Sequence, residues 1–143
     1  MTAIEEIKEQ LAGVWVLKTN ENLEAYLQEI GVGFVMRKIA LAANSTMTIA
    51  IEGQKIRIST NRPKDSQAFF ALGKEFDSKD PQDNQFKAVA TWKDGVLTTQ
   101  ARPVDEFMGI PHLIERRIVD GDLEMKITVN NVVCKRIFKK KPT

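Results

Sequence analysis

The hydrophobic pattern of this 143-residue chain changes period once along its length. Up to about residue 43 most apolar residues repeat at helical spacing, whereas from Met47 onward they alternate with polar residues. Short alternating runs follow one another, separated by turn sequences at Asp94–Gly95, Asp120–Gly121 and Asn130–Asn131. With the run around Trp15 they make about ten strands. The pattern predicts a mainly β fold, an antiparallel barrel or clam rather than a parallel sheet.

Two helical segments precede the long series of strands. Leu23, Tyr26, Leu27 and Ile30 share one helix face, and the segment that starts near Phe34 forms a second amphipathic helix after Gly31. We therefore expect a helical hairpin, with Thr19 or Asn20 capping its start. Helical spacing at Ile4, Ile7 and Leu11 indicates a further turn or two before the first strand.

Composition and motifs exclude several classes of protein. The net charge is +2, and the ten aromatic residues form no basic stacking stripe, so we expect no nucleic-acid partner. One cysteine, no signal-like start and no apolar stretch of about 20 residues indicate a soluble chain of the cytosol. The single histidine, His112, is expected to be exposed in a hairpin. Without a catalytic spacing or metal-ligand cluster we expect no enzyme, no catalytic residue, no metal and no cofactor.

Two arginines occupy unexpected places in the strand pattern. Arg116 alternates with Ile114 and Ile118, and Arg136 lies in line with Cys134 and Phe138. Such arginines either extend to solvent from a strand end or point inward. An inward guanidinium suits a carboxylate ligand, because it offers two parallel donors and keeps its charge.

Several motifs occur in an order that is specific in combination. They are Gly13-Val14-Trp15, then "ENLEAYLQEIGVGFVMRKIA", "LGKEFD", the strand-embedded Arg116, and finally Arg136-Ile137-Phe138. From Leu11 to about Lys140 the chain closely resembles the intracellular fatty-acid-binding proteins, the cytosolic lipid-binding family that includes cellular retinoid carriers. The resemblance implies a ten-stranded antiparallel β-clam with a helix-turn-helix lid around a cavity. The whole chain, 1–143, would be one such domain with a short extension over about residues 1–10.

The resemblance also implies site residues. The family's carboxylate site of two arginines and a tyrosine falls on Arg116, Arg136 and Phe138, so a hydroxyl is missing at the last position. Other departures are Ser45 in place of a proline and a longer hairpin around residues 102–112. The residues that the resemblance places in the cavity or its portal are Leu23, Leu27, Met36, Met47, Ile58, Lys64, Met125, Ile127 and Cys134.

The expected function is therefore that of a non-enzymatic cytoplasmic carrier. It would bind a long-chain fatty acid through the arginine pair, act as a monomer and deliver its ligand between membranes. Transient contact with anionic membrane surfaces would involve Arg37 and Lys38 on the second helix. The alternative ligand is a retinoid or another amphipathic carboxylate, because the arginines select a carboxylate and an apolar wall does not discriminate between chain lengths.

Overall fold

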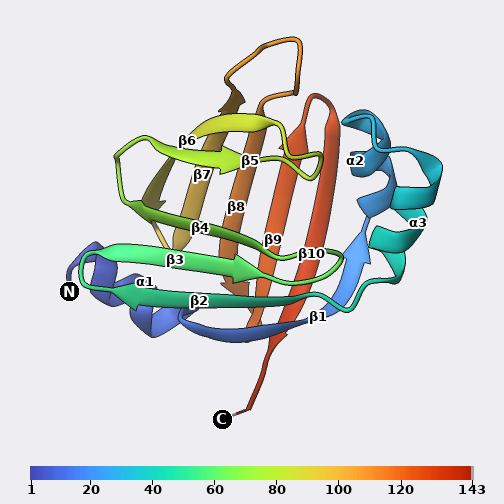
Figure 1. Ribbon diagram of the computed structural model, residues 1–143. Helices are drawn as coiled ribbons and strands as arrows, with labels where there is room; N and C mark the ends of the chain where they lie inside the picture. Colours follow the sequence, from blue (N-terminus) through green and yellow to red (C-terminus); the bar gives the residue numbers. More distant parts are fainter. Residues whose placement is uncertain (143) are drawn as a thin grey trace.

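In the computed structural model, which describes residues 1–142, ten antiparallel strands curve into a nearly closed barrel (Figure 1). Three helices accompany them within this range. The elements are α1 (Ala3–Leu11), β1 (Gly13–Glu21), α2 (Leu23–Glu29), α3 (Phe34–Ala42), β2 (Thr46–Glu52), β3 (Lys55–Thr60), β4 (Ser66–Ala71), β5 (Phe76–Lys79), β6 (Gln85–Lys93), β7 (Val96–Pro103), β8 (His112–Val119), β9 (Asp122–Val129) and β10 (Val132–Lys140). The predicted β-clam with a helical lid is confirmed.

The barrel is one sheet whose two edge strands meet without a hydrogen-bonded ladder. The strand order runs β4-β3-β2-β1-β10-β9-β8-β7-β6-β5. Between β4 and β5 the rings of Phe70 and Phe76 stack with their centroids 4.6 Å apart. Lys64, on the β3–β4 turn, donates to the carbonyl of Pro81 at 3.0 Å and pairs with Asp83 at 2.8 Å. Side chains therefore hold this seam together where backbone hydrogen bonds do not.

Tight turns connect three pairs of strands in the second half, as the sequence predicts. Asp94, Asp120 and Asn130 have φ of 51°, 51° and 53°, and Gly95 and Gly121 follow the first two with φ of 77° and 85°. In the two Asp–Gly turns, positive φ at successive residues twists the turn in the same sense as the flanking strands. These turns fix the registers of the β6–β7, β8–β9 and β9–β10 hairpins.

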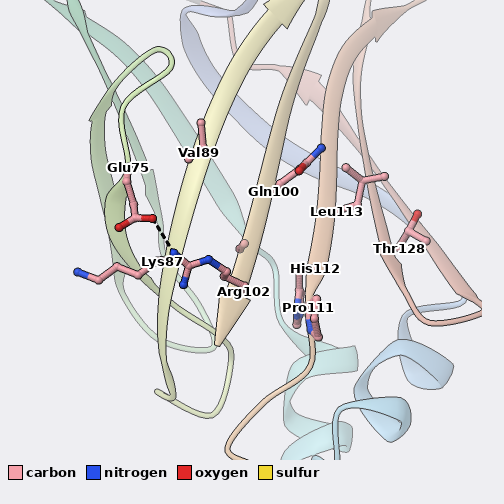
Figure 2. A pocket seen from close by; sticks show the side chains of 10 residues that line it. Glu75, Lys87, Val89, Gln100, Arg102, Pro111, His112, Leu113 and Thr128 are labelled. Carbon is pink, nitrogen blue, oxygen red and sulfur yellow. Dashed lines mark hydrogen bonds and ion pairs between the residues drawn. The ribbon is translucent and has the colours of Figure 1, made fainter. Parts of the chain in front are cut away.

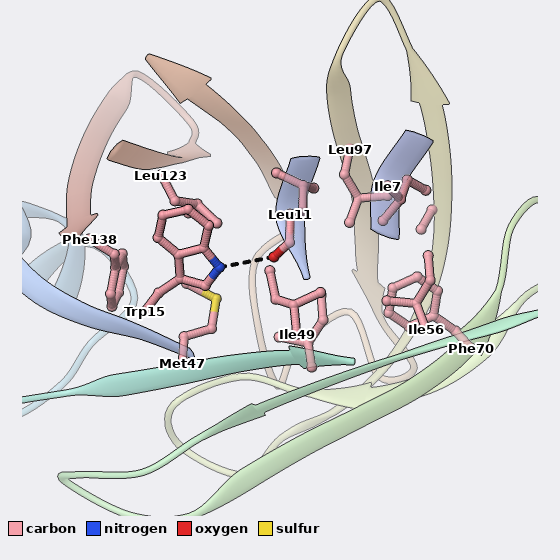
Figure 3. Close-up of a cluster of buried hydrophobic side chains, with 12 residues drawn as sticks. Ile7, Leu11, Trp15, Met47, Ile49, Ile56, Phe70, Leu97, Leu123 and Phe138 are labelled. Carbon is pink, nitrogen blue, oxygen red and sulfur yellow. Dashed lines mark hydrogen bonds between the residues drawn. The ribbon is translucent and has the colours of Figure 1, made fainter. Parts of the chain in front are cut away.

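The N-terminal helix is longer than expected and closes one end of the barrel. It has nine residues, and the Oγ of Thr2 caps it by accepting from the Glu5 amide at 3.2 Å. Ile7 and Leu11 are fully buried among side chains of the strands (Figure 3). Trp15 donates from Nε1 to the Leu11 carbonyl at 2.9 Å. This segment is thus part of the core.

The predicted cap of the helical hairpin is wrong. Thr19 and Asn20 belong to β1, because that strand continues its pairing with β10 as far as Glu21. The residue before α2 is Asn22, which has a left-handed φ of 65° and makes no side-chain cap bond. Asn20 is left free for a different contact inside the barrel.

Candidate functional site

Arg116 lies at the middle of β8 and points into the barrel. Its cross-strand neighbours are Leu97 on β7 and Met125 on β9. Its exposed fraction is 8% and, within residues 1–142, its guanidinium forms no hydrogen bond or ion pair, with Nε fully buried. Burial lowers the pKa of Arg116 to about 10, so the group remains charged at neutral pH. A side chain buried this deeply does not extend to solvent, so that alternative is wrong for Arg116.

Arg136 occupies the same transverse row two strands away, on β10. Met125 is its neighbour on one side and Asn20 its neighbour on the other. Its Nε donates to the Asn20 Oδ1 at 2.9 Å, and its Nη2 donates to the Ser45 Oγ at 3.3 Å. Burial lowers the pKa of this guanidinium too. Unlike Arg116, Arg136 therefore has polar partners in the barrel wall.

Phe138 fills the position at which the resemblance calls for a tyrosine. It is 1% exposed and packs in the cluster of buried hydrophobic side chains that contains Trp15 and Leu123 (Figure 3). The Arg136 guanidinium lies 5.5 Å from the centre of its ring, a cation–π contact. The ring thus supports Arg136 by packing and offers no hydrogen bond.

The row of Arg116, Met125 and Arg136 places two cations on the inner face of the barrel. Within the described residues, neither arginine pairs with a carboxylate. Met125 between them keeps accessible surface. Buried charge without a counter-ion is costly, so such a row favours binding of an anion from solution.

The remaining predicted site residues fall into two buried clusters and two surface positions. Leu23 and Leu27 of α2 pack together with Ile127 of β9 and Cys134 of β10. Met47 and Ile58 belong to the cluster around Trp15, and Met125 packs against both clusters. Met36 is 55% exposed on α3, and Lys64 bridges the seam. A portal role for these last two stays a prediction.

Cys134 is a buried side chain of the inner face. Its exposed fraction is zero, and burial raises the pKa of its thiol to about 11. The thiol is therefore protonated at neutral pH and behaves as a small apolar side chain.

The expectation that His112 is exposed is wrong. This residue is 7% exposed at the start of β8, just after Ile110, which packs against the cluster that contains Tyr26. Its ring contacts Tyr26 and Phe86 edge-on. The Ile110 carbonyl accepts from Nδ1 at 2.7 Å, so Nδ1 carries the proton and a neutral ring accepts from the Tyr26 hydroxyl at Nε2, at 2.8 Å. Sequence reasoning missed this link because it depends on the path of the loop.

Two further bonds fasten the α2–α3 region to the barrel. Gln82, on the β5–β6 turn, donates from Nε2 to the Gly31 carbonyl at 3.1 Å. Asn130, on the β9–β10 turn, donates to the Glu29 carboxylate at 2.9 Å. These two bonds come from exposed turns, and they add to the Tyr26–His112 bond.

A groove of about 440 Å³ lies on the outer wall of the barrel (Figure 2). Val89, Gln100, Leu113 and Thr128, which line it, alternate along their strands with inward side chains. Lys87 and Arg102 stand at its side, paired with Asp77 and Glu75. Neither Arg116 nor Arg136 is among the described residues that line it. The groove is therefore separate from the arginine row.

Helix length gives one further observation. Among residues 1–142, no helix is both long enough and apolar enough to cross a membrane.

The fold defines a class: small lipocalin-like β-barrels. The model of the lipocalin / cytosolic fatty-acid binding protein family matches residues 12–141. This chain belongs to that family.

Individual relatives are similar in sequence to this chain over nearly its full length. The adipocyte fatty acid-binding protein of Pygoscelis papua is 36% identical over 133 residues, which cover 92% of this chain and 98% of the relative. The sodium/calcium exchanger regulatory protein 1 of Doryteuthis pealeii is 34% identical and covers 91% and 96%. Fatty acid-binding protein 9 of Homo sapiens is 32% identical and covers 92% and 98%.

Solved structures are also similar in fold to this chain over nearly its full length. The REP1-NXSQ fatty acid transporter superposes with a TM-score of 0.85 at 32% identity, covering 93% of this chain and 97% of the transporter. Apo lipid binding protein 8 of Caenorhabditis elegans gives a TM-score of 0.87 at 25% identity, with 99% of each chain covered.

Proposed function

We propose that this protein is a non-enzymatic cytoplasmic carrier that binds one long-chain fatty acid inside its barrel as a monomer. The observation that carries the proposal is Arg116, a buried guanidinium without a partner among the described residues. A fatty acid suits this interior in two respects. Its carboxylate compensates the arginine row, and its chain covers inward apolar side chains.

Burial of methylene groups favours a ligand with a long chain. Each buried methylene contributes about 0.8 kcal/mol, so roughly fifteen of them offer about 12 kcal/mol before ordering costs. Pairing of the carboxylate with the arginines mainly prevents a loss of binding free energy, because a buried charge without a partner would cancel much of that gain. A guanidinium supplies charge-assisted hydrogen bonds of about 1.5 to 3 kcal/mol each.

We expect the ligand to enter between α3 and the turns that Lys64 bridges. This portal would need only local opening of the exposed contacts at Lys64 and Gln82. The apolar interior sets no strict length for the ligand, so a retinoid or another amphipathic carboxylate is the alternative ligand. Native mass spectrometry of the purified protein with its co-purified lipid distinguishes these ligands by mass.

Head-group discrimination tests the carboxylate site. Displacement of a fluorescent fatty acid by oleate and by oleyl alcohol is measured for the unmodified protein and for Arg116→Leu and Arg136→Leu. Each variant should weaken oleate binding by about tenfold or more and leave the alcohol nearly unchanged, since only the acid uses the guanidinium. Lys135→Leu, which removes an outward cation from the same strand, is the control. Equal losses for acid and alcohol would contradict a carboxylate contact.

The outer face of α3 supports a further part of the proposal, delivery to membranes. Phe34, Val35, Met36 and Ile39 are between 48% and 69% exposed, and α3 has no fully buried residue. Lys38 lies over the Phe34 ring at 5.2 Å. Apolar side chains beside a cation suit the interface of an anionic membrane.

Ligand transfer to vesicles tests this part. Transfer of a fluorescent fatty acid should be faster to vesicles that contain phosphatidylserine than to phosphatidylcholine vesicles. Phe34→Ser combined with Lys38→Gln should remove most of the difference without changing oleate affinity. Transfer rates that ignore vesicle charge would argue for release into solution.

A further inference from the structure

Asn20 and Ser45 hold one edge of the Arg136 guanidinium. Asn20, on β1, accepts from Nε at 2.9 Å, and Ser45, just before β2, accepts from Nη2 at 3.3 Å. Nε and Nη2 lie on the same side of the planar fork. These two contacts therefore occupy that side, and the end that carries both Nη groups stays available to a ligand.

Ser45 is itself fixed as an acceptor. It is 3% exposed, and its hydroxyl donates to the Arg62 carbonyl at 2.9 Å. A hydroxyl has a single proton, so the Ser45 oxygen presents lone pairs to Arg136. The Ser45 carbonyl accepts from the Leu17 amide at 3.0 Å, which anchors the backbone at this point. The contact is thus built into the junction between α3, β1 and the β3–β4 turn.

Position 138 offers no alternative to these contacts. The Phe138 ring supports the guanidinium at 5.5 Å but has no oxygen to direct it. Arg116, in the same row, has no polar partner within residues 1–142. Asn20 and Ser45 are therefore the polar groups that determine the direction of an arginine in this site.

We propose that Asn20 and Ser45 are positioning residues, which hold Arg136 with its free end toward a bound carboxylate and compensate for the hydroxyl that Phe138 lacks. This inference rests on the proposed carboxylate site. It assigns the two arginines different tasks. Arg116 meets the carboxylate as its principal partner, whereas Arg136 adds contacts from a direction that the wall has already set.

The experiment compares oleate and oleyl alcohol on Asn20→Leu, Ser45→Ala and the double variant. Leucine keeps the branched shape of Asn20 without an acceptor, and Ser59→Ala on β3 is the matched control for the serine. Each single variant should lower the affinity for oleate by about three- to tenfold and the double variant by more, with the alcohol affinity unchanged. Thermal unfolding identifies any variant that fails to fold.

Phe138→Tyr supplies a readout that a purely structural role would not move. In the unmodified chain this change should raise oleate affinity only by the bond that the new hydroxyl itself makes to the carboxylate, because Arg136 is already directed. In the Asn20→Leu background the gain should be several-fold larger, because the hydroxyl then also directs Arg136. The arginine Nε–H signals of an ¹⁵N-labelled sample give a second readout, since the Arg136 signal should exchange faster with water in Asn20→Leu.

The outcomes separate the two proposals. An unmodified protein that binds acid and alcohol alike would overturn the carboxylate site itself. A protein that discriminates, but whose Asn20 and Ser45 variants keep the same ratio of acid to alcohol affinity, would overturn the positioning role alone. An equal gain from Phe138→Tyr in both backgrounds would also overturn it.

Discussion

At the scale of single residues, the surroundings of each side chain decide its chemistry more than its type does. Arg116 and Arg136 both face Met125 across a strand pair. One is buried without a polar partner in the described chain, and the other is held by an amide and a hydroxyl. Ligand binding should therefore change the environment of Arg116 more than that of Arg136.

His112 makes a pH dependence testable at one residue. Burial lowers the pKa of His112, and the Ile110 hydrogen bond and the Asp80 charge oppose this effect only in part. The unfolded chain therefore binds the proton more readily than the folded one. As the pH falls below the ordinary histidine value of about 6.5, the free energy of unfolding should decrease.

Urea unfolding at pH 7.5 and 5.5 measures this effect. The unmodified protein should lose more stability between these two values than His112→Gln, which has no titrating ring. Because the chain has one histidine, its proton NMR signal gives the pKa directly. An identical loss in both proteins, or a histidine pKa above 6.5, would contradict the buried neutral ring.

At the scale of elements, the two ends of the barrel differ. α1 places Ile7 and Leu11 in the core at no exposure, whereas α3 buries no side chain fully. The lid is fastened by the Tyr26–His112 bond and by exposed side chains of two turns. The α1 end therefore serves as a closed base, and the lid end is the one suited to local opening.

Leu11→Ala tests the role of α1. Loss of a fully buried leucine side chain should lower the free energy of unfolding by about 2 to 5 kcal/mol. Glu9→Ala, on the exposed face of the same helix, should change it by about 0.5 kcal/mol or less. Chemical denaturation followed by tryptophan fluorescence measures both. Similar small effects would contradict the packing of α1 against Trp15.

At the scale of the whole molecule, most of the fold could be predicted from the alternating hydrophobic pattern of the sequence. The period of two and the Asp–Gly and Asn–Asn turns specify the strands, and their registers bring Arg116 and Arg136 into one row. The contacts of Asn20 and Ser45 with Arg136 join residues 116 and 91 positions apart. No local pattern encodes such contacts. The burial of His112 depends in the same way on a long loop.

In the proposed complex a fatty acid lies in the barrel with its carboxylate against Arg116 and Arg136. The most direct measurement is ¹³C NMR of the protein with oleate labelled at its carboxyl carbon, followed from pH 8 to pH 5. Two nearby cations lower the pKa of a carboxylate, so we expect one bound signal that does not shift over this range and that begins to titrate in Arg116→Leu. A bound signal that titrates in the unmodified protein like a solvent-exposed carboxylate would contradict this proposal.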